Sequence, residues 1–252
     1  MTAATRALVR RPGSRLADGL VTHLERQPID VGLALRQWEG YVAALQDSGW
    51  ETVHVPPADD CPDAVFIEDT VVVCDGLAVI TRPGAVARRP ETDAVEQTLR
   101  DLRLRVERIE PPGTLDGGDI LQIGQTVYVG RGGRTNADGI AQLAELLAGR
   151  TTVTVPLEKV LHLKSAVTAL PDGTVLAHGD LVDLDSFPRV RRVPEEAGAH
   201  VVPLGGPDVL IAASAPRTAE LINALGWRPV VVDITEYERL EGCVTCLSVL
   251  IP

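Results

Sequence analysis

The chain of 252 residues has little of several features that mark particular protein classes. It contains four cysteines, too few for the disulfide framework that stabilises small secreted domains. Its apolar runs fall well short of the ~20 residues that a membrane-spanning helix needs. The 24 Lys and Arg residues are outnumbered by 35 Asp and Glu, and the net charge of −11 disfavours a nucleic acid or an anionic membrane surface as a partner.

The N-terminal segment also lacks the long apolar core of a secretory signal peptide, because Arg6, Arg10 and Arg11 interrupt its apolar residues. We therefore expect a cytoplasmic protein whose thiols stay reduced. A hydrophobic content of 45% is ample for a buried core. The negative charge would suit a small cationic substrate.

Secondary-structure elements are predicted in a repeating order of short strands, a turn, an amphipathic helix and a further strand. This order returns at intervals of roughly 40 to 50 residues, which is typical of a circular or stacked array of units. The predicted strands are 52–55, 71–74, 77–81, 105–109, 126–130, 152–155, 167–170, 209–212 and 230–233. The predicted helices contain residues 35–45, 95–102, 140–147 and 217–225, and the third is capped near Asn136.

No Gly/Ser-rich linker or run of like charge divides the chain, so we expect one domain over residues 1–252 with about five β-rich units. The mixture of strands and helices favours an α/β fold over an all-β fold. A doubly wound Rossmann sheet is disfavoured because no Gly-x-Gly-x-x-Gly turn follows an early strand.

Cys246 is the first candidate for chemistry, and Cys243 makes it part of a Cys-x-x-Cys pair. Zinc and redox interpretations stay open, although a structural zinc site needs four ligands and a thioredoxin-type pair opens a helix. Here residues 247–251 are predicted to continue as a strand. An isolated cysteine is more often a buried structural residue than a nucleophile, so the interpretation depends on other residues.

Two upstream segments supply the partners that a cysteine nucleophile needs. His162 begins the polar patch His162-Leu-Lys-Ser165, and Asp116 lies in Leu115-Asp-Gly-Gly-Asp119. The Asp-Gly pair is also common in plain β-turns, but the two glycines allow close backbone approach around a carboxylate. A thiol, a histidine and a carboxylate together predict a nucleophile with its base and orienting group.

Charged residues at predicted strand ends suggest ligands for a charged substrate. In segment 63–69, alternation predicts a strand with Asp63 and Asp69 on one face and Glu68 on the other. No Lys or Arg lies among these acids, so they are either solvated or paired with a cation from elsewhere. Arginines that follow strand ends could bind a carboxylate bidentately; they are Arg82, Arg88, Arg89 and Arg134.

In this order along the chain, the motifs resemble those of the dimethylarginine dimethylaminohydrolase family, one of the guanidino-group-modifying enzyme families. The resemblance runs nearly end to end, and the order and spacing of its motifs make it specific. The motifs are Arg15-Leu-Ala-Asp-Gly-Leu20, residues 63–69, Ile80-Thr-Arg-Pro-Gly84 with Arg88-Arg89, Leu115-Asp-Gly-Gly-Asp119, Arg134-Thr-Asn136, Leu161-His-Leu-Lys-Ser165 and residues 242–248.

The resemblance implies a pentein fold, a five-unit α/β propeller of ββαβ units with pseudo-fivefold symmetry, in agreement with the repeats. It implies that Cys246 is the nucleophile, His162 the general acid/base and Asp116 the carboxylate that orients the imidazole. Some relatives have Glu in place of Asp116. Cys243 lies where relatives often have no thiol, so we expect no catalytic role for it.

The resemblance also implies which residues surround the substrate. Arg88 and Arg134 would bind its α-carboxylate. The backbone carbonyls of Leu20, on a mobile lid, and Leu240 would accept from its α-amino group. Glu68 and Asp69 would bind its guanidinium, and Asp63 would complete the acidic wall.

The implied reaction is hydrolysis of asymmetric dimethylarginine or monomethylarginine to citrulline and dimethylamine or methylamine, through a covalent thiouronium on the cysteine. It needs no metal ion and no organic cofactor. The only partner expected is this small-molecule substrate, and the protein is expected to be a monomer or a homodimer.

Three alternatives remain at this stage. An arginine deiminase would act on unmethylated arginine, but deiminases typically have an acidic residue two positions after the histidine, where this chain has Lys164. A non-catalytic pentein binding module would have no reason to keep the thiol, the histidine and the Asp-Gly-Gly-Asp element together. A redox or zinc protein would use Cys243 with Cys246.

Overall fold

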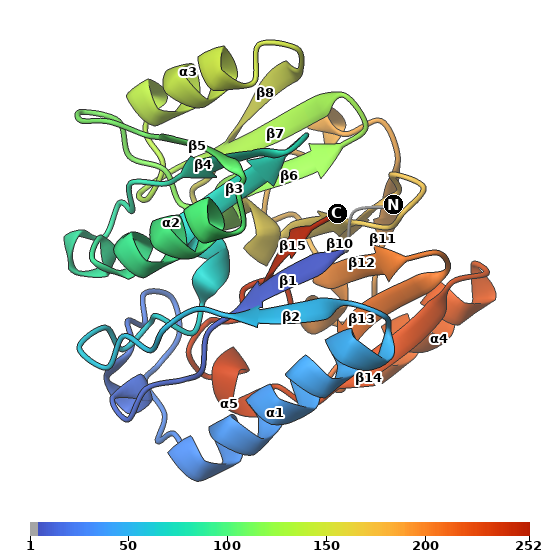
Figure 1. Cartoon of the computed structure of the whole chain (residues 1–252). Coiled ribbons are helices and arrows are strands. Elements are labelled where there is room, and N and C mark those ends of the chain that lie inside the picture. The colour runs from blue at the N-terminus through green and yellow to red at the C-terminus, as the bar shows by residue number, and fades with distance from the viewer. Residues whose placement is uncertain (1–4) are drawn as a thin grey trace.

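Five three-stranded sheets surround a common centre in the computed structural model, which describes residues 5–252 (Figure 1). In each sheet the middle strand pairs antiparallel with one neighbour and parallel with the other. An antiparallel neighbour can follow through a tight turn, whereas a parallel one needs a crossover, and helices supply it in four of the five units. This arrangement is the five-unit α/β propeller that the sequence predicted.

The second unit illustrates how the sequence builds each repeat. Strands β3 (Val71–Cys74) and β4 (Leu77–Ile80) form a hairpin across Asp75 and Gly76, whose φ angles of 49° and 77° fit the turn that the twist of a hairpin favours. Helix α2 (Glu91–Asp101) then buries Val95 and Leu99, and β5 (Arg105–Arg108) returns parallel to β4.

Two further units repeat this order, and a fourth departs from it. One of the two consists of β6 (Ile120–Ile123), β7 (Thr126–Arg131), α3 (Ala137–Leu146) and β8 (Thr151–Pro156). The other consists of β12 (Val201–Gly205), β13 (Asp208–Ala212), α4 (Pro216–Ala224) and β14 (Arg228–Val232). In the fourth, β9 (Val167–Ala169), β10 (Val175–Ala177) and β11 (Val190–Arg192) are joined with a short 3-10 helix, Leu184–Ser186, in place of an α-helix.

The remaining unit joins the two ends of the chain. Strand β1 (Arg6–Val9) pairs antiparallel with β15 (Val249–Ile251) and parallel with β2 (Glu51–His54), which follows α1 (Val31–Asp47). The last strand therefore completes the first sheet and closes the ring, with β15 beside β1 (Figure 1). Cys246 lies just before β15 and is held at this closure.

Side chains that cross from one unit to the next stabilise the ring. Gln122 of β6 donates to the carbonyl oxygen of Val73 in β3 (3.0 Å), and the indole N–H of Trp50 donates to the carbonyl oxygen of Leu204 in β12 (2.8 Å). The apolar residues of the strands fill the space between sheets and helices.

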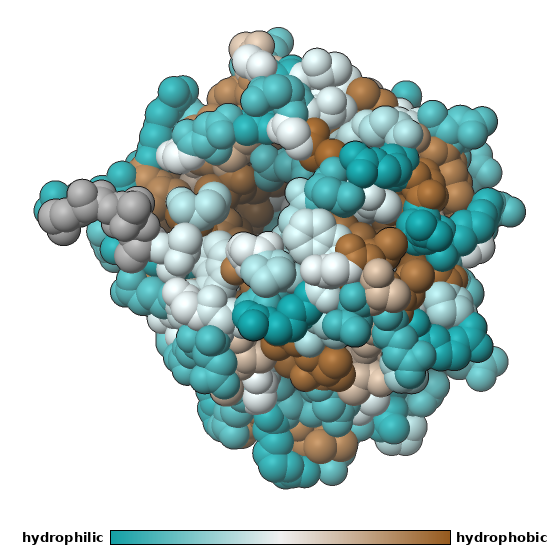
Figure 2. All heavy atoms as spheres, turned by 90° about the vertical axis from the view of Figure 1, so that its right-hand side faces the viewer, coloured by the Kyte–Doolittle hydropathy of each residue, from teal (hydrophilic) through white to brown (hydrophobic). Residues whose placement is uncertain are grey.

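No helix among the described residues is long and apolar enough to cross a membrane. On the face in Figure 2, hydrophilic residues surround a hollow with hydrophobic walls.

The predicted strands of the repeats and all four predicted helices are confirmed, and Asn136 caps α3 by accepting a hydrogen bond from Gly139 N–H (2.8 Å). The predicted strand over 63–69 is wrong, because Ile67–Thr70 forms a 3-10 helix. Glu68 and Asp69 are buried there, and this turn brings each carboxylate to its own cation, Lys164 for Glu68 and Arg88 for Asp69. The last strand also starts later than predicted, at Val249, because a tight turn ends at Cys246.

Candidate active site

Cys246 lies in a turn between α5 (Thr235–Glu238) and β15. Its backbone N–H donates to the carbonyl oxygen of Cys243 (3.1 Å), and its own carbonyl oxygen accepts from Glu68 N–H (3.2 Å). These bonds fix the turn against the acidic segment of the second unit. The thiol is 8% exposed and faces a small pocket.

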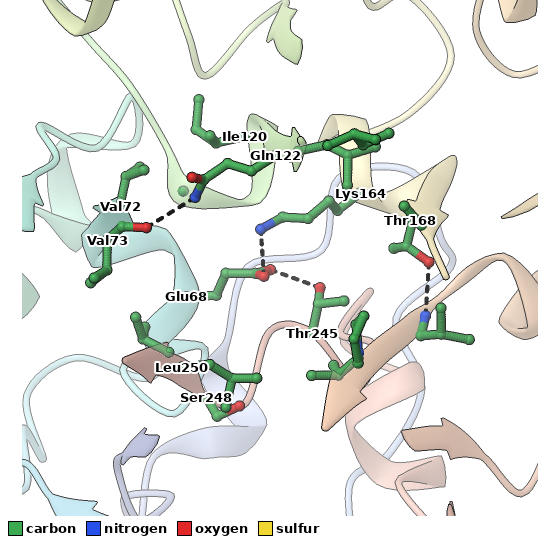
Figure 3. A pocket seen from close by; sticks show the side chains of 18 of the residues that line it. Glu68, Val72, Val73, Ile120, Gln122, Lys164, Thr168, Thr245, Ser248 and Leu250 are labelled. Carbon is green, nitrogen blue, oxygen red and sulfur yellow. Dashed lines mark hydrogen bonds and ion pairs between the residues drawn. The ribbon is translucent and has the colours of Figure 1, made fainter. Parts of the chain in front are cut away.

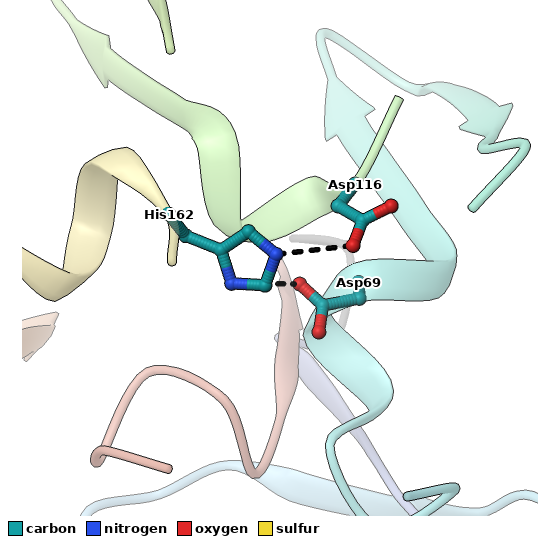
Figure 4. Close-up of side chains that lie close together, drawn as sticks. All are labelled: Asp69, Asp116 and His162. Atoms are coloured by element: carbon teal, nitrogen blue, oxygen red, sulfur yellow. Dashed lines mark hydrogen bonds and ion pairs between the residues drawn. The ribbon is translucent and has the colours of Figure 1, made fainter. Parts of the chain in front are cut away.

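His162 enters the same pocket from the loop after β8, at the start of a 3-10 helix. Its Nε2 lies 3.0 Å from Oδ2 of Asp116, and its Nδ1 lies 3.8 Å from Oδ1 of Asp69 (Figure 4). Burial alone would lower the pKa of His162, but the charges of Asp69 and Asp116 outweigh it and raise this pKa to about 9. The imidazole is therefore protonated at neutral pH, and Nδ1, beyond hydrogen-bond distance of Asp69, can donate to a reacting group.

Asp116 is held rigidly behind the histidine and is fully buried. Its Oδ1 accepts a hydrogen bond from Gly84 N–H (2.8 Å), and its own N–H donates to Oγ1 of Thr135 (3.1 Å). The next residue, Gly117, has to lack a side chain, because a Cβ there would lie 2.0 Å from the carbonyl oxygen of Glu68. The close approach expected from the paired glycines is confirmed.

Asp69 provides a negative charge beside the histidine. Its carboxylate accepts hydrogen bonds from the guanidinium of Arg88 and from Gly118 N–H (2.9 Å). Burial opposes its ionisation, but the positive charges of His162 and Arg88 lower the pKa of Asp69 to about 2. Asp69 is thus ionised at every physiological pH and can attract a cation.

All predicted site residues except Glu68 and Asp116 line this pocket, which we call the thiol pocket. Its volume is about 20 Å³, less than a molecule of arginine needs, so the loop over it has to move for a substrate to enter. The lining residues are Leu20, Asp63, Phe66, Asp69, Arg88, Arg134, Leu161, His162, Leu240, Glu241, Gly242 and Cys246.

The two arginines of the thiol pocket differ in how their donors are used. Arg88 is buried and donates to Asp69, to both carboxylate oxygens of Glu91 (2.8–3.2 Å) and to two backbone carbonyls, so most of its five N–H donors are engaged. Nη1 of Arg134 is buried without a hydrogen-bond acceptor among the described residues and lies 3.7 Å from Oδ2 of Asp116. Because an unpaired buried donor is costly, Arg134 is the arginine better prepared to bind a carboxylate.

Glu68 does not face the thiol pocket, contrary to what the resemblance implied. Its Oε1 lies 2.6 Å from Nζ of Lys164, and its Oε2 accepts a hydrogen bond from Thr245 (2.8 Å), in a separate cavity of about 560 Å³ (Figure 3). Burial raises the pKa of Glu68 to about 7, although Lys164 opposes the shift. Lys164 and Arg88 are thus the cations that the acidic segment required.

The loop over the pocket is tied by two carboxylates. Leu20 N–H donates to Asp63 (3.0 Å), and the N–H groups of residues 22–24 donate to the carboxylate of Glu241. Glu241 is not among the predicted site residues, because nothing in its local pattern distinguishes it from a solvated turn residue. Its φ of 61° is the one available signal, and only coordinates reveal it.

Asp119 is a second residue with a role that its sequence pattern does not indicate. Its Oδ1 accepts from Leu163 N–H (3.0 Å), and its Oδ2 accepts from Oγ1 of Thr135 (2.6 Å). It therefore connects the loop of His162 to the loop of Arg134. Burial raises the pKa of Asp119 to about 6.

Asp69, Asp116 and His162 bring three possible metal-ligand atoms within 4.8 Å of one another (Figure 4). The carboxylates already have positive neighbours, since Arg88 contacts Asp69 and Arg134 lies near Asp116. Arginine and imidazolium compete with a metal ion for the same oxygens, which disfavours a metal ion at this cluster.

Comparisons with known proteins agree with this geometry. The family model described as arginine deiminase matches residues 56–228. A solved structure of a Pseudomonas aeruginosa dimethylarginine dimethylaminohydrolase mutant complexed with citrulline superimposes with a TM-score of 0.91 at 37% identity, and covers 98% of both chains. The fold and the site together define a pentein of the guanidino-group-modifying class.

Two curated relatives define the family more narrowly. The N(G),N(G)-dimethylarginine dimethylaminohydrolase of Streptomyces coelicolor is 63% identical over 97% of this chain and 96% of its own length. The enzyme of the same name from Pseudomonas aeruginosa is 39% identical over 96% of this chain and 97% of its own length. The chain belongs to the dimethylarginine dimethylaminohydrolase family.

Proposed function

We propose that the protein hydrolyses Nω-methylated arginine to citrulline and the corresponding methylamine. The observation that carries this proposal is the thiol pocket itself. It holds Cys246 and His162 between an ionised carboxylate, Asp69, and Arg134, which has a donor without an acceptor within residues 5–252. A methylated arginine has the matching charges, a cationic guanidinium at one end and an α-carboxylate at the other.

Asp69 binds the guanidinium in this proposal, with Asp63 on the same wall, and Arg134 binds the α-carboxylate. Arg88 lines the pocket and positions Asp69, with at most one remaining donor for the substrate. The carbonyl groups of Leu20 and Leu240 accept from the α-amino group. Glu68 supports the site from the neighbouring cavity, through its contact with the Cys246 turn. Binding at both ends would hold the guanidinium carbon next to Cys246.

The reaction then proceeds in two halves. Cys246 loses its thiol proton to solvent and its Sγ atom attacks the guanidinium carbon. His162, oriented by Asp116, protonates the departing dimethylamine or methylamine, which leaves a covalent thiouronium. The imidazole next removes a proton from water, whose oxygen attacks the same carbon. The C–S bond breaks, the thiol is restored and citrulline is released.

A second candidate, hydrolysis of arginine itself, is favoured by the match to the arginine deiminase family model. The two candidates differ only in the leaving group, ammonia or a methylamine. Lys164 occupies the position where a deiminase typically has a second acidic clamp, and it is paired with Glu68 outside the thiol pocket. The site therefore offers fewer charged groups to the outer nitrogens, which suits a guanidinium that carries methyl groups.

The test is citrulline release from asymmetric dimethylarginine, monomethylarginine and arginine, with the unmodified protein and Cys246→Ser side by side. Citrulline from the methylated substrates alone, lost in the variant, supports the proposal. Turnover of arginine alone would identify a deiminase. No citrulline from any of them, with a folded protein, would favour a non-catalytic binding module.

The proposal includes a cytoplasmic location and a monomer or homodimer as its working form. Fractionation of the producing cells tests the first, and light scattering after gel filtration tests the second. Citrulline formation itself depends on neither.

A further inference from the structure

The turn that carries Cys246 also contains a second thiol in direct contact with it. The Sγ atoms of Cys243 and Cys246 lie 3.4 Å apart, and the backbone N–H of Cys243 points at Sγ of Cys246, also at 3.4 Å. Both side chains are more than nine-tenths buried. The proposed reaction uses only one of the two thiols, so the other needs an explanation.

The backbone of this turn fits a disulfide. The hydrogen bond from Cys246 N–H to the Cys243 carbonyl oxygen makes residues 243–246 a tight turn, whose end Cα atoms lie within about 7 Å. Disulfides commonly join Cα atoms at 4.4–6.8 Å. The sulfurs have to approach by only about 1.4 Å to reach a bonded distance, which side-chain rotation can supply.

The two thiols open to different spaces. Cys246 faces the thiol pocket, whereas Cys243 lines a neighbouring cavity of about 440 Å³ that also includes His200 and Ser165. A molecule the size of hydrogen peroxide can therefore reach Cys243 without entering the thiol pocket.

We propose that Cys243 and Cys246 form a reversible disulfide when the protein meets a hydroperoxide, and that the disulfide switches the enzyme off. The loss of activity rests on the proposed function, because the bond removes the nucleophile. The bond formation itself rests only on the geometry of the pair.

The chemistry balances with the peroxide as the oxidant. The Cys243 sulfur attacks one peroxide oxygen, the O–O bond breaks, and the departing hydroxide takes a proton to become water. The resulting sulfenic acid is attacked by the Cys246 sulfur, so that an S–S bond forms as the S–O bond breaks. The second hydroxide takes the remaining thiol proton, and two thiols and one peroxide have become one disulfide and two waters.

The acidity of the two thiols supports this order. The hydrogen bond with Cys246 lowers the pKa of Cys243, and His200 adds to the effect. The same shared proton, with burial and the charges of Glu68 and Asp69, raises the pKa of Cys246. Thiolates react with peroxides and thiols do so poorly, which makes Cys243 the first to react.

The experiment treats the full-length protein with hydrogen peroxide and follows two readouts. Mass spectrometry of the non-reduced protein should show a species lighter by the two thiol hydrogens, with a peptide map that links Cys243 to Cys246. Citrulline release should fall by at least about tenfold and return after dithiothreitol. Because the mass readout needs no turnover, it separates this proposal from the proposed function.

Cys243→Ser is the informative variant, compared in each case with its own untreated sample. Its inactivation by peroxide should be slower by about tenfold and should not be reversed by dithiothreitol. Replacing the remote Cys61 and Cys74 with Ala is the matched control and should leave the linked species unchanged. Wild-type protein that gains oxygen at Cys246 without any linked pair would overturn the proposal, as would dithiothreitol-reversible inactivation of Cys243→Ser at the wild-type rate.

Discussion

The imidazole of His162 and the carboxylate of Asp116 are joined by a 3.0 Å contact between Nε2 and Oδ2, with no part of Asp116 exposed. In this buried site the contact orients the ring, and together with the charge of Asp69 it keeps the ring protonated. It leaves Nδ1 on the side of the thiol pocket that carries Asp69. The acid that the proposed reaction requires is therefore present at neutral pH before any substrate binds.

Replacing Asp116 with Asn should lower kcat by about 10³-fold and shift its pH profile. The raised pKa of His162, about 9, keeps the imidazole charged, so activity in the unmodified protein should decline as the pH rises through about 9. An uncharged amide no longer stabilises the imidazolium, and the decline should move to lower pH. Profiles of kcat against pH for both proteins measure this. An unchanged alkaline limb would mean that Asp116 does not set the charge of the ring.

Little of the thiol's activation should come from the protein alone. The pKa of the Cys246 thiol is raised by its hydrogen bond with Cys243, by burial and by the nearby charges of Glu68 and Asp69. A bound guanidinium introduces the opposite charge beside the sulfur, so it should lower this pKa and increase the thiolate fraction. The ultraviolet absorbance of the thiolate, titrated with and without an inert cationic analogue, checks this, with Cys246→Ser as the blank. An absorbance that does not increase on binding would contradict the idea.

The two pocket arginines should respond differently to substitution by Gln. Arg134 has a donor with no acceptor in the described part of the chain, so Arg134→Gln should raise KM by about 10- to 100-fold with a smaller change in kcat. Arg88 links Asp69 to Glu91 inside the protein, so Arg88→Gln removes the cation that these two buried carboxylates share and should lower the stability by about 3 kcal/mol. Steady-state kinetics and urea unfolding separate the two effects. A purely kinetic effect of Arg88→Gln would make it a direct substrate ligand.

Most of the fold could be predicted from the sequence because the periodicity of each strand and helix is local. The helix after Asn136, for example, followed from this capping residue and from the spacing of Ile140, Leu143 and Leu147. The conformation of the acidic segment could not be predicted in the same way, because it depends on residues outside the segment. Glu68 pairs with Lys164 and Asp69 pairs with Arg88, and both cations lie far from the segment in the sequence. Glu241 and Asp119 act through backbone N–H groups of other loops, and no pattern in one segment announces such contacts.

The Lys164–Glu68 pair should make stability depend on pH. The pKa of Glu68 in the folded chain, about 7, lies above its ordinary value of 4.5, so the folded state holds the proton more tightly than the unfolded state. The contribution of the protonated Glu68 to the free energy of unfolding is therefore complete below about pH 4.5, and it is lost as the pH rises through about 7. Lys164→Met removes the counter-charge, so it should raise the pKa of Glu68 further and make the loss of stability at alkaline pH larger than in the unmodified protein. Urea unfolding at pH values from about 5 to about 9, on the two sides of this titration, measures the loss of stability. The double variant with Glu68→Gln is the control and should show no added pH dependence.

Glu241 should control the opening of the loop over the thiol pocket. Its carboxylate accepts hydrogen bonds from Thr22 and Leu24 N–H (3.0 and 2.7 Å), and charged acceptors hold such bonds more strongly than neutral ones. Glu241→Gln should therefore speed amide exchange in residues 20–26 and raise KM several-fold, by about 1 kcal/mol in binding. Since Glu241 also borders the pocket, hydrogen exchange is the decisive readout. Glu238→Gln, in the same turn region but bonded to Ser214, is the matched control and should leave the loop's exchange unchanged. Equal exchange in the wild type and Glu241→Gln would show that the loop is held by other contacts, such as Leu20 with Asp63.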